Sequence, residues 1–220
     1  MKVPSVEQIR EADNYTISYE PIISIDLMER ASQVFVNWFS TKVKQNKRII
    51  VCAGKGNNGG DGLAIARLLN KMKYDVSVII LNYTDNASKD FSINFERIKK
   101  IKAISITELN SDSKPPDLSS FDVVIDALWG SGLSRPIDFF SEKFIDNINS
   151  TDTKVYSVDI PSGLHADKYI NSINDELLPL QCVLKTVSTE GFQSSRTNTI
   201  MFNRVTTQFE PSNKDISQID

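Results

Sequence analysis

The sequence predicts an α/β domain with a mostly parallel central sheet and helices on both of its faces. Short apolar runs of strand length alternate along the chain with segments whose apolar residues recur at helical spacing, the pattern of repeated strand–helix–strand units. The clearest unit runs from Arg48 to Met72: a β-branched run, five glycines within nine residues, then an apolar helical stripe. A length of 220 residues with 40% hydrophobic and 24% charged residues is ordinary for one globular domain.

Two helices are predicted ahead of the first strand. Ser5-Val6-Glu7-Gln8 matches a capping box, so a helix should begin there and run to about Tyr15. A second helix is predicted from about Ser24 to Lys44, on a single apolar stripe. The stripe consists of Leu27, Ala31, Val34, Phe35 and Trp38. We expect it to face the core, and a surface for a partner is the alternative.

Five strands are predicted, at 48–51, 76–81, 103–106, 121–126 and 155–159, because these runs are short and mainly apolar. Between them, helices are predicted around 65–72, 88–100 and 137–148, each from apolar residues on one face. The polar, proline-containing stretch 110–116 is predicted to be a loop. We assign residues 1–210 to one domain and expect the polar tail 211–220 to be disordered.

The loop after the first strand, Gly54 to Gly62, is predicted to contact a ligand. Its glycines let the backbone turn sharply, and the following helix presents unpaired N–H groups, which is a natural site for an anion such as a diphosphate. Asn57, Asn58 and Asp61 lie among the glycines without an obvious role in the core. The spacing fits neither the Walker pattern nor the dinucleotide fingerprint, and a plain structural turn is the alternative.

Two more strand ends carry polar, glycine-containing loops. Asp126 ends one strand and opens the stretch to Pro136, in which Arg135 could form a bidentate contact to phosphate. Asp159 ends another and is followed by Ile-Pro-Ser-Gly-Leu, in which Ser162 offers a hydroxyl. Ligands of open α/β sheets bind at the carboxyl ends of the strands, so the three loops are expected to form one site. Either aspartate could instead be only a cap or turn former.

Three side chains of these loops suggest a cation site. Asn58, Asp126 and Ser162 are hard oxygen donors, which suit an alkali or alkaline-earth cation rather than zinc or copper. With one formal charge among them, a monovalent cation is the better match.

Composition and motifs argue against several other classes of protein. A net charge of −3 gives no broad attraction to nucleic acid. No apolar run reaches transmembrane length and the N-terminus lacks an apolar signal region, so we expect no membrane association and a cytoplasmic location. The two cysteines, Cys52 and Cys182, suggest neither a disulfide framework nor a metal site. A Ser-His-Asp triad is poorly supported, because His165 is the single histidine and no nucleophile elbow appears.

The three loops together resemble the NAD(P)H-hydrate epimerase family, also called the YjeF N-terminal domain. The family pattern is approximately G-x-G-N-N-G-G-D-G, then D-A-L-F-G-T-G-L, then D-I-P-S-G-L, and here it falls on 54–62, 126–133 and 159–164. Glu7-Gln8-Ile9-Arg10, Asp13 and Leu27-Met28-Glu29-Arg30-Ala31 are also similar to family sequence. The match covers about Ser5 to Asp167 in order.

The resemblance implies a Rossmann-like three-layer α/β/α sandwich, a homodimer, and inversion at C6 of the hydrated nicotinamide ring of NADHX or NADPHX. It also implies functional coupling to a separate NAD(P)HX dehydratase. Family potassium ligands fall on Asn58, Asp126 and Ser162, and Asp159 is our candidate for proton transfer. Family substrate contacts fall on Asn57, Asn58, Gly59, Gly60, Asp61, Gly130, Ser131, Gly132, Leu133, Ser134, Arg135, Pro136 and Asp159.

The chain departs from the family pattern after about Ile170. Val187 stands where the family has aspartate, Gly191 stands where it has threonine, and the final D-I-G strand is not recognisable. This divergence keeps a second function open: a nucleotide-binding or scaffold domain of the same fold without catalytic activity. A nicotinamide dehydrogenase is a third reading, but the chain lacks the dinucleotide fingerprint.

Overall fold

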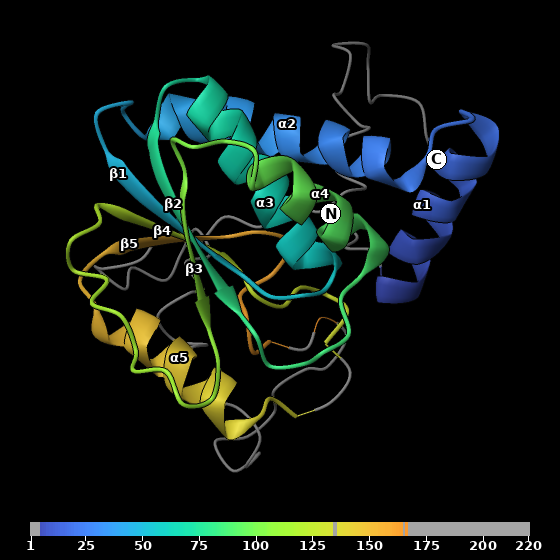
Figure 1. Ribbon diagram of the computed structural model, residues 1–220. Coiled ribbons are helices and arrows are strands. Elements are labelled where there is room, and N and C mark those ends of the chain that lie inside the picture. The colour runs from blue at the N-terminus through green and yellow to red at the C-terminus, as the bar shows by residue number, and fades with distance from the viewer. Residues whose placement is uncertain (1–4, 134–135, 165, 167–220) are drawn as a thin grey trace, which may run out of the picture.

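In the part of the chain that the structure describes, the protein is an α/β sandwich around a five-stranded parallel sheet (Figure 1). A computed structural model describes residues 5–133, 136–164 and 166. The strands are β1 (Arg48–Ala53), β2 (Asp75–Leu81), β3 (Ser105–Leu109), β4 (Val123–Ala127) and β5 (Lys154–Ser157). They lie in the order β3-β2-β1-β4-β5, and every pair of neighbours is parallel. The predicted fold class is therefore confirmed.

The strand order reverses direction once. From β1 the chain moves outward to β2 and β3, and then returns to place β4 on the other side of β1. The loops after β1 and β4 therefore leave the sheet as neighbours that diverge, which opens a crevice at the carboxyl ends of these two strands. The fold thus creates a binding position between the first and second glycine-containing loops.

Helices cover both faces of the sheet. Figure 1 shows α2 (Ser24–Lys42), α3 (Asn57–Lys71) and α4 (Lys89–Ile98) on one face and α5 (Phe139–Ser150) on the other. Helix α1 (Val6–Tyr19) lies at the outer end of α2 (Figure 1). The capping box predicted at Ser5 is present, with Gln8 N–H bonded to Ser5 Oγ at 3.2 Å and Gln8 Oε1 accepting from Ser5 N–H at 2.9 Å.

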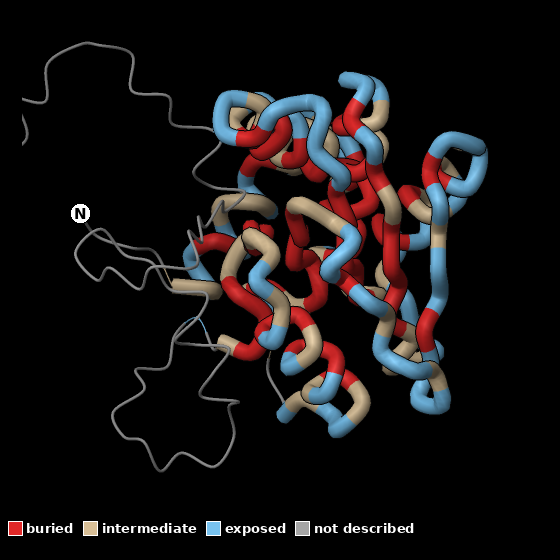
Figure 2. Tube along the Cα trace, turned by 90° about the vertical axis from the view of Figure 1, so that its left-hand side faces the viewer, coloured by how far each residue is buried: buried red, intermediate tan, exposed pale blue. Residues whose placement is uncertain are grey.

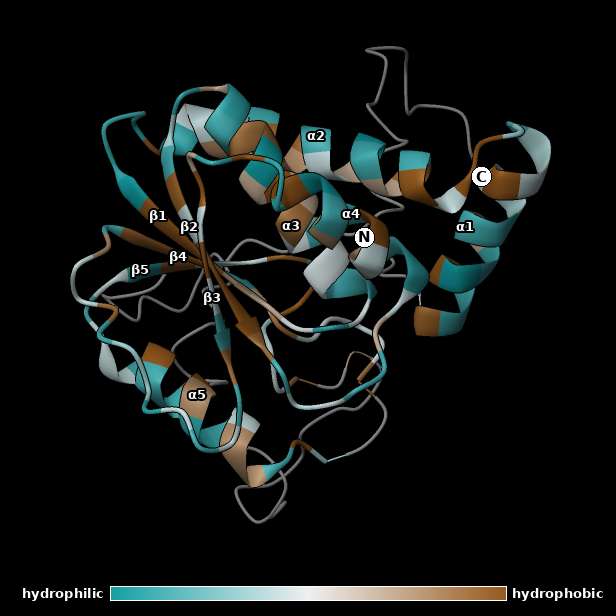
Figure 3. Ribbon diagram, viewed as in Figure 1, coloured by the Kyte–Doolittle hydropathy of each residue, from teal (hydrophilic) through white to brown (hydrophobic). Residues whose placement is uncertain are grey.

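Alternation along the strands divides the core into two layers. Ile49, Val51 and Ala53 of β1 pack under α2 and α3, whereas Ile50 and Cys52 face the α5 side. Because both faces are covered, β1 and β4 are buried along almost their whole length. Figure 2 shows that buried residues concentrate in the interior and that exposed residues lie mainly at the periphery. Apolar residues accordingly concentrate on the strands and on the sheet-facing sides of the helices (Figure 3).

Several predicted boundaries were wrong by a few residues. The first helix continues to Tyr19 rather than Tyr15, and the second ends at Lys42. Strand β3 runs from Ser105 to Leu109, not over 103–106, because its polar residues Thr107 and Glu108 lie on an edge strand where one side faces solvent. Predictions for the chain beyond residue 166, including the disordered tail 211–220, lie outside the described residues.

Candidate active site

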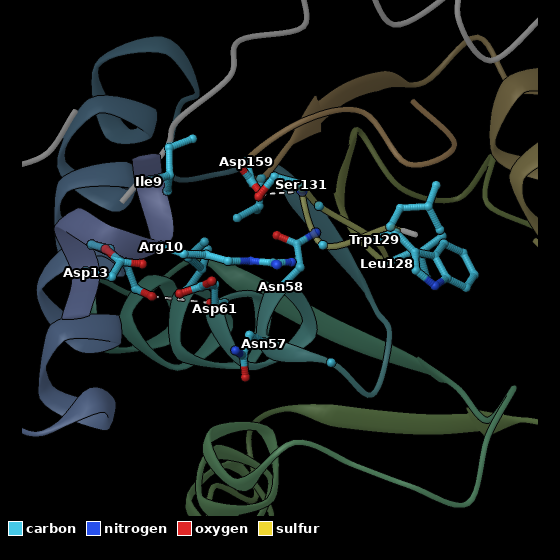
Figure 4. A pocket seen from close by; sticks show the side chains of 18 of the residues that line it. Ile9, Arg10, Asp13, Asn57, Asn58, Asp61, Leu128, Trp129, Ser131 and Asp159 are labelled. Carbon is cyan, nitrogen blue, oxygen red and sulfur yellow. Dashed lines mark hydrogen bonds between the residues drawn. The ribbon is translucent and has the colours of Figure 1, made fainter. Parts of the chain in front are cut away.

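The crevice at the carboxyl ends of β1 and β4 holds a cavity of about 830 Å³. It is bounded by α1, α2, the start of α3, Tyr83 after β2, the segment between β4 and α5, and the loop after β5. Figure 4 shows Asn58 near its centre, with Arg10 and Asp13 of α1 on one side and Asp159 with Ser131 on another. A volume of this size is typical of cofactor-sized ligands.

The first wall is the N-terminus of α3, which begins at Asn57, so residues 57–62 of the predicted loop are helical. Gly56 is the N-cap and supplies no capping side chain, and the first helical hydrogen bond runs from Gly60 N–H to Gly56 C=O at 3.0 Å. The N–H groups of the first turn therefore have no partner within the helix, which favours an anion there. Gly59 is required for this compact turn, since a Cβ would lie 2.6 Å from the Gly54 carbonyl carbon and closer still to its oxygen.

The amide of Asn58 lacks a hydrogen-bond partner. Both its Oδ1 and its Nδ2 are buried, and neither bonds to another group of the described protein. An unsatisfied buried amide costs on the order of 1–3 kcal/mol, so such a group is a strong sign of a bound ligand or ion. Asn58 also lies on the cavity wall.

Asp159 occupies a restricted backbone conformation beside the cavity. Its φ is +66°, in the left-handed region that few non-glycine residues adopt, and such strain often accompanies functional sites. Its Oδ2 accepts a hydrogen bond of 2.6 Å from Ser131 N–H, which ties the β5 loop to the β4 loop. Gly130 makes room for this carboxylate: a Cβ there would lie within 3.0 Å of Oδ2 and 3.1 Å from Cγ.

Asp126 and Ser162 are buried and bonded to each other, and neither lines the cavity. Ser162 Oγ donates to Asp126 Oδ1 at 2.5 Å, and Ser162 N–H donates to Oδ2 at 2.9 Å. The strand register places Asp126 opposite Cys52 of β1 and Ser157 of β5, and Ser157 Oγ also donates to Oδ2 at 3.0 Å. Burial raises the pKa of Asp126, while hydrogen bonds from Ser162, Leu128 and Ser157 partly oppose that rise.

Most of the predicted site residues lie together. The cavity is lined by Asn57, Asn58, Asp61, Gly130, Ser131, Gly132, Leu133, Pro136 and Asp159. Gly59 and Gly60 do not line it, because they pack inward: Gly59 against Gly54, and Gly60 against Met28 and Phe91. Ser134, Arg135 and His165 lie outside the described residues.

Sequence reasoning missed the contribution of α1 and of two aromatic residues. Ile9, Arg10 and Asp13 reach the cavity from α1, at helical spacing that places them on one face. Tyr83, after β2, and Trp129 contribute a ring pair whose centroids are 4.9 Å apart. Residues 7–10 and Asp13 are similar to family sequence, and this similarity was the signal that could have identified α1 as part of the site.

A family model described as "YjeF-related protein N-terminus" matches residues 24–177. The chain belongs to this family. The matched region includes all three loops of the cavity, and α1 lies ahead of that region. Among the described residues, no helix has the length and apolar character needed to cross a membrane.

Curated relatives agree with the YjeF assignment, and a solved structure shares the fold. The chain is 38% identical over 164 residues to the NAD(P)H-hydrate epimerase of Lentilactobacillus buchneri, covering 74% of each chain. It is 37% identical over 169 residues to the Bifunctional NAD(P)H-hydrate repair enzyme Nnr of Thermofilum pendens, covering 76% of this chain and 32% of that one. The crystal structure of yeast YNL200c shares the fold, with a TM-score of 0.68 at 20% identity over 99% of this chain and 98% of that one.

Proposed function

We propose that this protein is an NAD(P)H-hydrate epimerase, an isomerase that interconverts the R and S forms of NADHX and NADPHX at C6. The observation that carries the proposal is the Asp159 carboxylate, fixed by Ser131 N–H on the wall of a cavity lined by the glycine loop. Relatives 32–38% identical to this chain are named NAD(P)H-hydrate epimerase.

The reaction requires a group that accepts and returns one proton. C6 of the hydrate carries a hydroxyl and the ring nitrogen, so inversion proceeds by opening either the C–O or the C–N bond and closing it on the other face. In the C–N route, a carboxylate takes the hydroxyl proton, the C–N electron pair moves to nitrogen, and an aldehyde forms at C6. Rotation and reclosure then return the proton to oxygen, with no net change in protons or electrons. Asp159 is the described carboxylate that we assign to this role.

The remainder of the cavity suits the rest of the substrate. The uncapped N-terminus of α3 can receive a phosphate through the N–H groups around Asn57 and Asn58. Tyr83 and Trp129 offer aromatic surface for a flat ring. The other residues of the glycine loop and of the β4 loop that line the cavity are proposed to contact the substrate as well.

We also propose that Asn58, Asp126 and Ser162 hold a potassium ion. The donor set fits, because the Asn58 amide is buried without a partner and Asp126 is a buried carboxylate. Potassium would supply a fixed positive charge that orders the loops and the ligand, without redox chemistry. Asp126→Asn is expected to raise the potassium concentration needed for half-maximal activity, measured as a potassium titration with lithium as the control cation. An unchanged requirement would count against the assignment.

The epimerase proposal is tested by separating R-NADPHX and S-NADPHX chromatographically during incubation with the pure protein. Addition of an S-specific dehydratase should then consume both epimers, because the R form is converted continuously. A rate equal to spontaneous epimerisation would contradict the proposal. Binding of NADP⁺ without any turnover would instead favour the second prediction, an inactive nucleotide-binding or scaffold domain.

We also propose that the protein works together with a dehydratase and that it forms a homodimer. Coupling to a dehydratase is supported by the Thermofilum pendens relative, whose name combines repair activities in one bifunctional chain. A homodimer remains a proposal, which sedimentation equilibrium would test.

A further inference from the structure

Arg10 of α1 supplies the positively charged side chain on the described wall of the cavity. It is the only lysine or arginine among the described residues that line the cavity, whereas four aspartates do so. Figure 4 shows its side chain extending from α1 across the cavity towards Asn58. The guanidinium therefore approaches the N-terminus of α3 from the opposite wall.

Arg10 makes no ion pair or side-chain hydrogen bond with the part of the protein that the structure describes. This is notable because Asp13 is on the next turn of the same helix and Asp61 lies on the same cavity. Arg30 and Arg67, by contrast, each pair with a glutamate. A structural role as a salt-bridge partner therefore does not account for the position of Arg10.

The groups facing Arg10 favour an anionic ligand. The N-terminal turn of α3 is uncapped, and the buried Asn58 amide between it and Arg10 has neither of its polar atoms bonded. An oxyanion in this space would receive hydrogen bonds from main-chain N–H groups and from the planar guanidinium, which binds phosphate in a bidentate manner.

Among the described residues, helix α1 has little buried surface. Ile9 and Thr16 are its only buried residues among the fourteen from Val6 to Tyr19, and Tyr15 and Tyr19 are largely exposed. A helix with so little apolar burial gains most from an additional contact at its cavity-facing side.

We propose that Arg10 binds a phosphate group of the substrate and that this contact fastens α1 over the cavity. The inference rests on the proposed function for the identity of the ligand, and assigns Arg10 a binding role in that site. The phosphate is either the diphosphate, which NADHX and NADPHX share, or the 2′-phosphate, which only NADPHX carries.

The test compares Arg10→Gln and Arg10→Lys with the wild type. Dissociation constants are measured calorimetrically for NADHX, NADPHX, NAD⁺, NADP⁺ and nicotinamide riboside, which has no phosphate. Arg97→Gln is the matched control, since it removes the same charge from a half-buried position of α4 that does not line the cavity.

Arg10→Gln should weaken binding of the phosphate-bearing ligands by about 10-fold. The expected loss is modest because Arg10 is exposed, and a charge-assisted hydrogen bond from an exposed arginine contributes less to binding than one from a buried arginine. Arg10→Lys should retain part of the affinity. Loss with both hydrates identifies the diphosphate, and loss with NADPHX alone identifies the 2′-phosphate. Unchanged affinity for both hydrates would overturn the proposal, as would an equal loss for nicotinamide riboside.

Hydrogen exchange supplies a second measurement that does not depend on turnover. Adding NADPHX should slow amide exchange in residues 6–19 of the wild type and of Arg97→Gln, but not of Arg10→Gln. Equal protection of α1 in Arg10→Gln would contradict the fastening role. The epimerisation assay on the wild type is run in parallel, so failure of the Arg10 inference is distinguished from failure of the proposed function.

Discussion

Replacing Gly130 by alanine tests whether Asp159 must stand where the structure places it. The added methyl would lie within 3.0 Å of Asp159 Oδ2 and 3.1 Å from both Cβ and Cγ of that residue. The carboxylate must retreat by about 1 Å to reach an ordinary van der Waals separation. Such a retreat also strains the 2.6 Å hydrogen bond from Ser131 N–H.

A displacement of this size in a reacting group costs about 10²-fold in rate. We therefore expect Gly130→Ala to lower kcat about 100-fold in the epimerisation assay. The free energy of unfolding should change by less than about 2 kcal/mol, since the crowding is offset by the reduced freedom of the unfolded chain. Urea denaturation checks that the variant is folded.

Gly132→Ala is the matched comparison. A Cβ at Gly132 meets no atom of the described residues within 4 Å, so this change adds the same methyl to the same loop without touching Asp159. Its kcat should stay within about threefold of the wild type, while KM is free to rise if substrate fills that space. Normal kcat in Gly130→Ala, or equal losses in both variants, would refute the reasoning about Asp159.

Two further changes test the fold that supports the site. Gly59→Ala should lower the free energy of unfolding by several kcal/mol or prevent soluble expression, because its Cβ would overlap the Gly54 carbonyl; urea denaturation measures this. Hydrogen bonds from Arg48 N–H and Lys47 lower the pKa of Asp122 in the folded protein. The ionised carboxylate therefore stabilises the fold at pH values above its unfolded pKa of about 3.9. This stabilisation is lost as the pH falls through the lower pKa of the folded state. Asp122→Asn should therefore be less stable than the wild type at neutral pH, and the gap should narrow below about pH 4; a gap that does not depend on pH would contradict this.

The fold could be predicted from the sequence because its signals are local. Strands β1, β2 and β4 are mainly apolar, and both covered faces follow from that pattern. Strand β3 was misplaced because an edge strand alternates polar and apolar residues, and Thr107 and Glu108 weaken its apolar signal. The alternation of strands and helices also breaks between β3 and β4, which a polar loop connects without a helix.

The site could be predicted only where its residues follow strands. Asn58, Asp126 and Asp159 each come at a strand end or its loop, so the rule for parallel sheets predicts all three at one edge of the sheet, and Asn58 and Asp159 line the cavity there. Arg10 lies 48 residues before the nearest of them, Asn58, and no local pattern indicates where its helix docks. The close approach of Gly130 to Asp159 depends on two loops from different strands and likewise has no local signal.

The most direct test of the account is the kinetics of Asp159→Asn. Asparagine keeps the size of the side chain and an acceptor for Ser131 N–H, but removes the basic site. Removal of a positioned acid–base group typically costs on the order of 10²–10⁴-fold, so kcat for interconversion of R-NADPHX and S-NADPHX should fall by that factor with the affinity for the hydrates little changed. Near-normal kcat in Asp159→Asn would contradict the central claim that this carboxylate carries the proton.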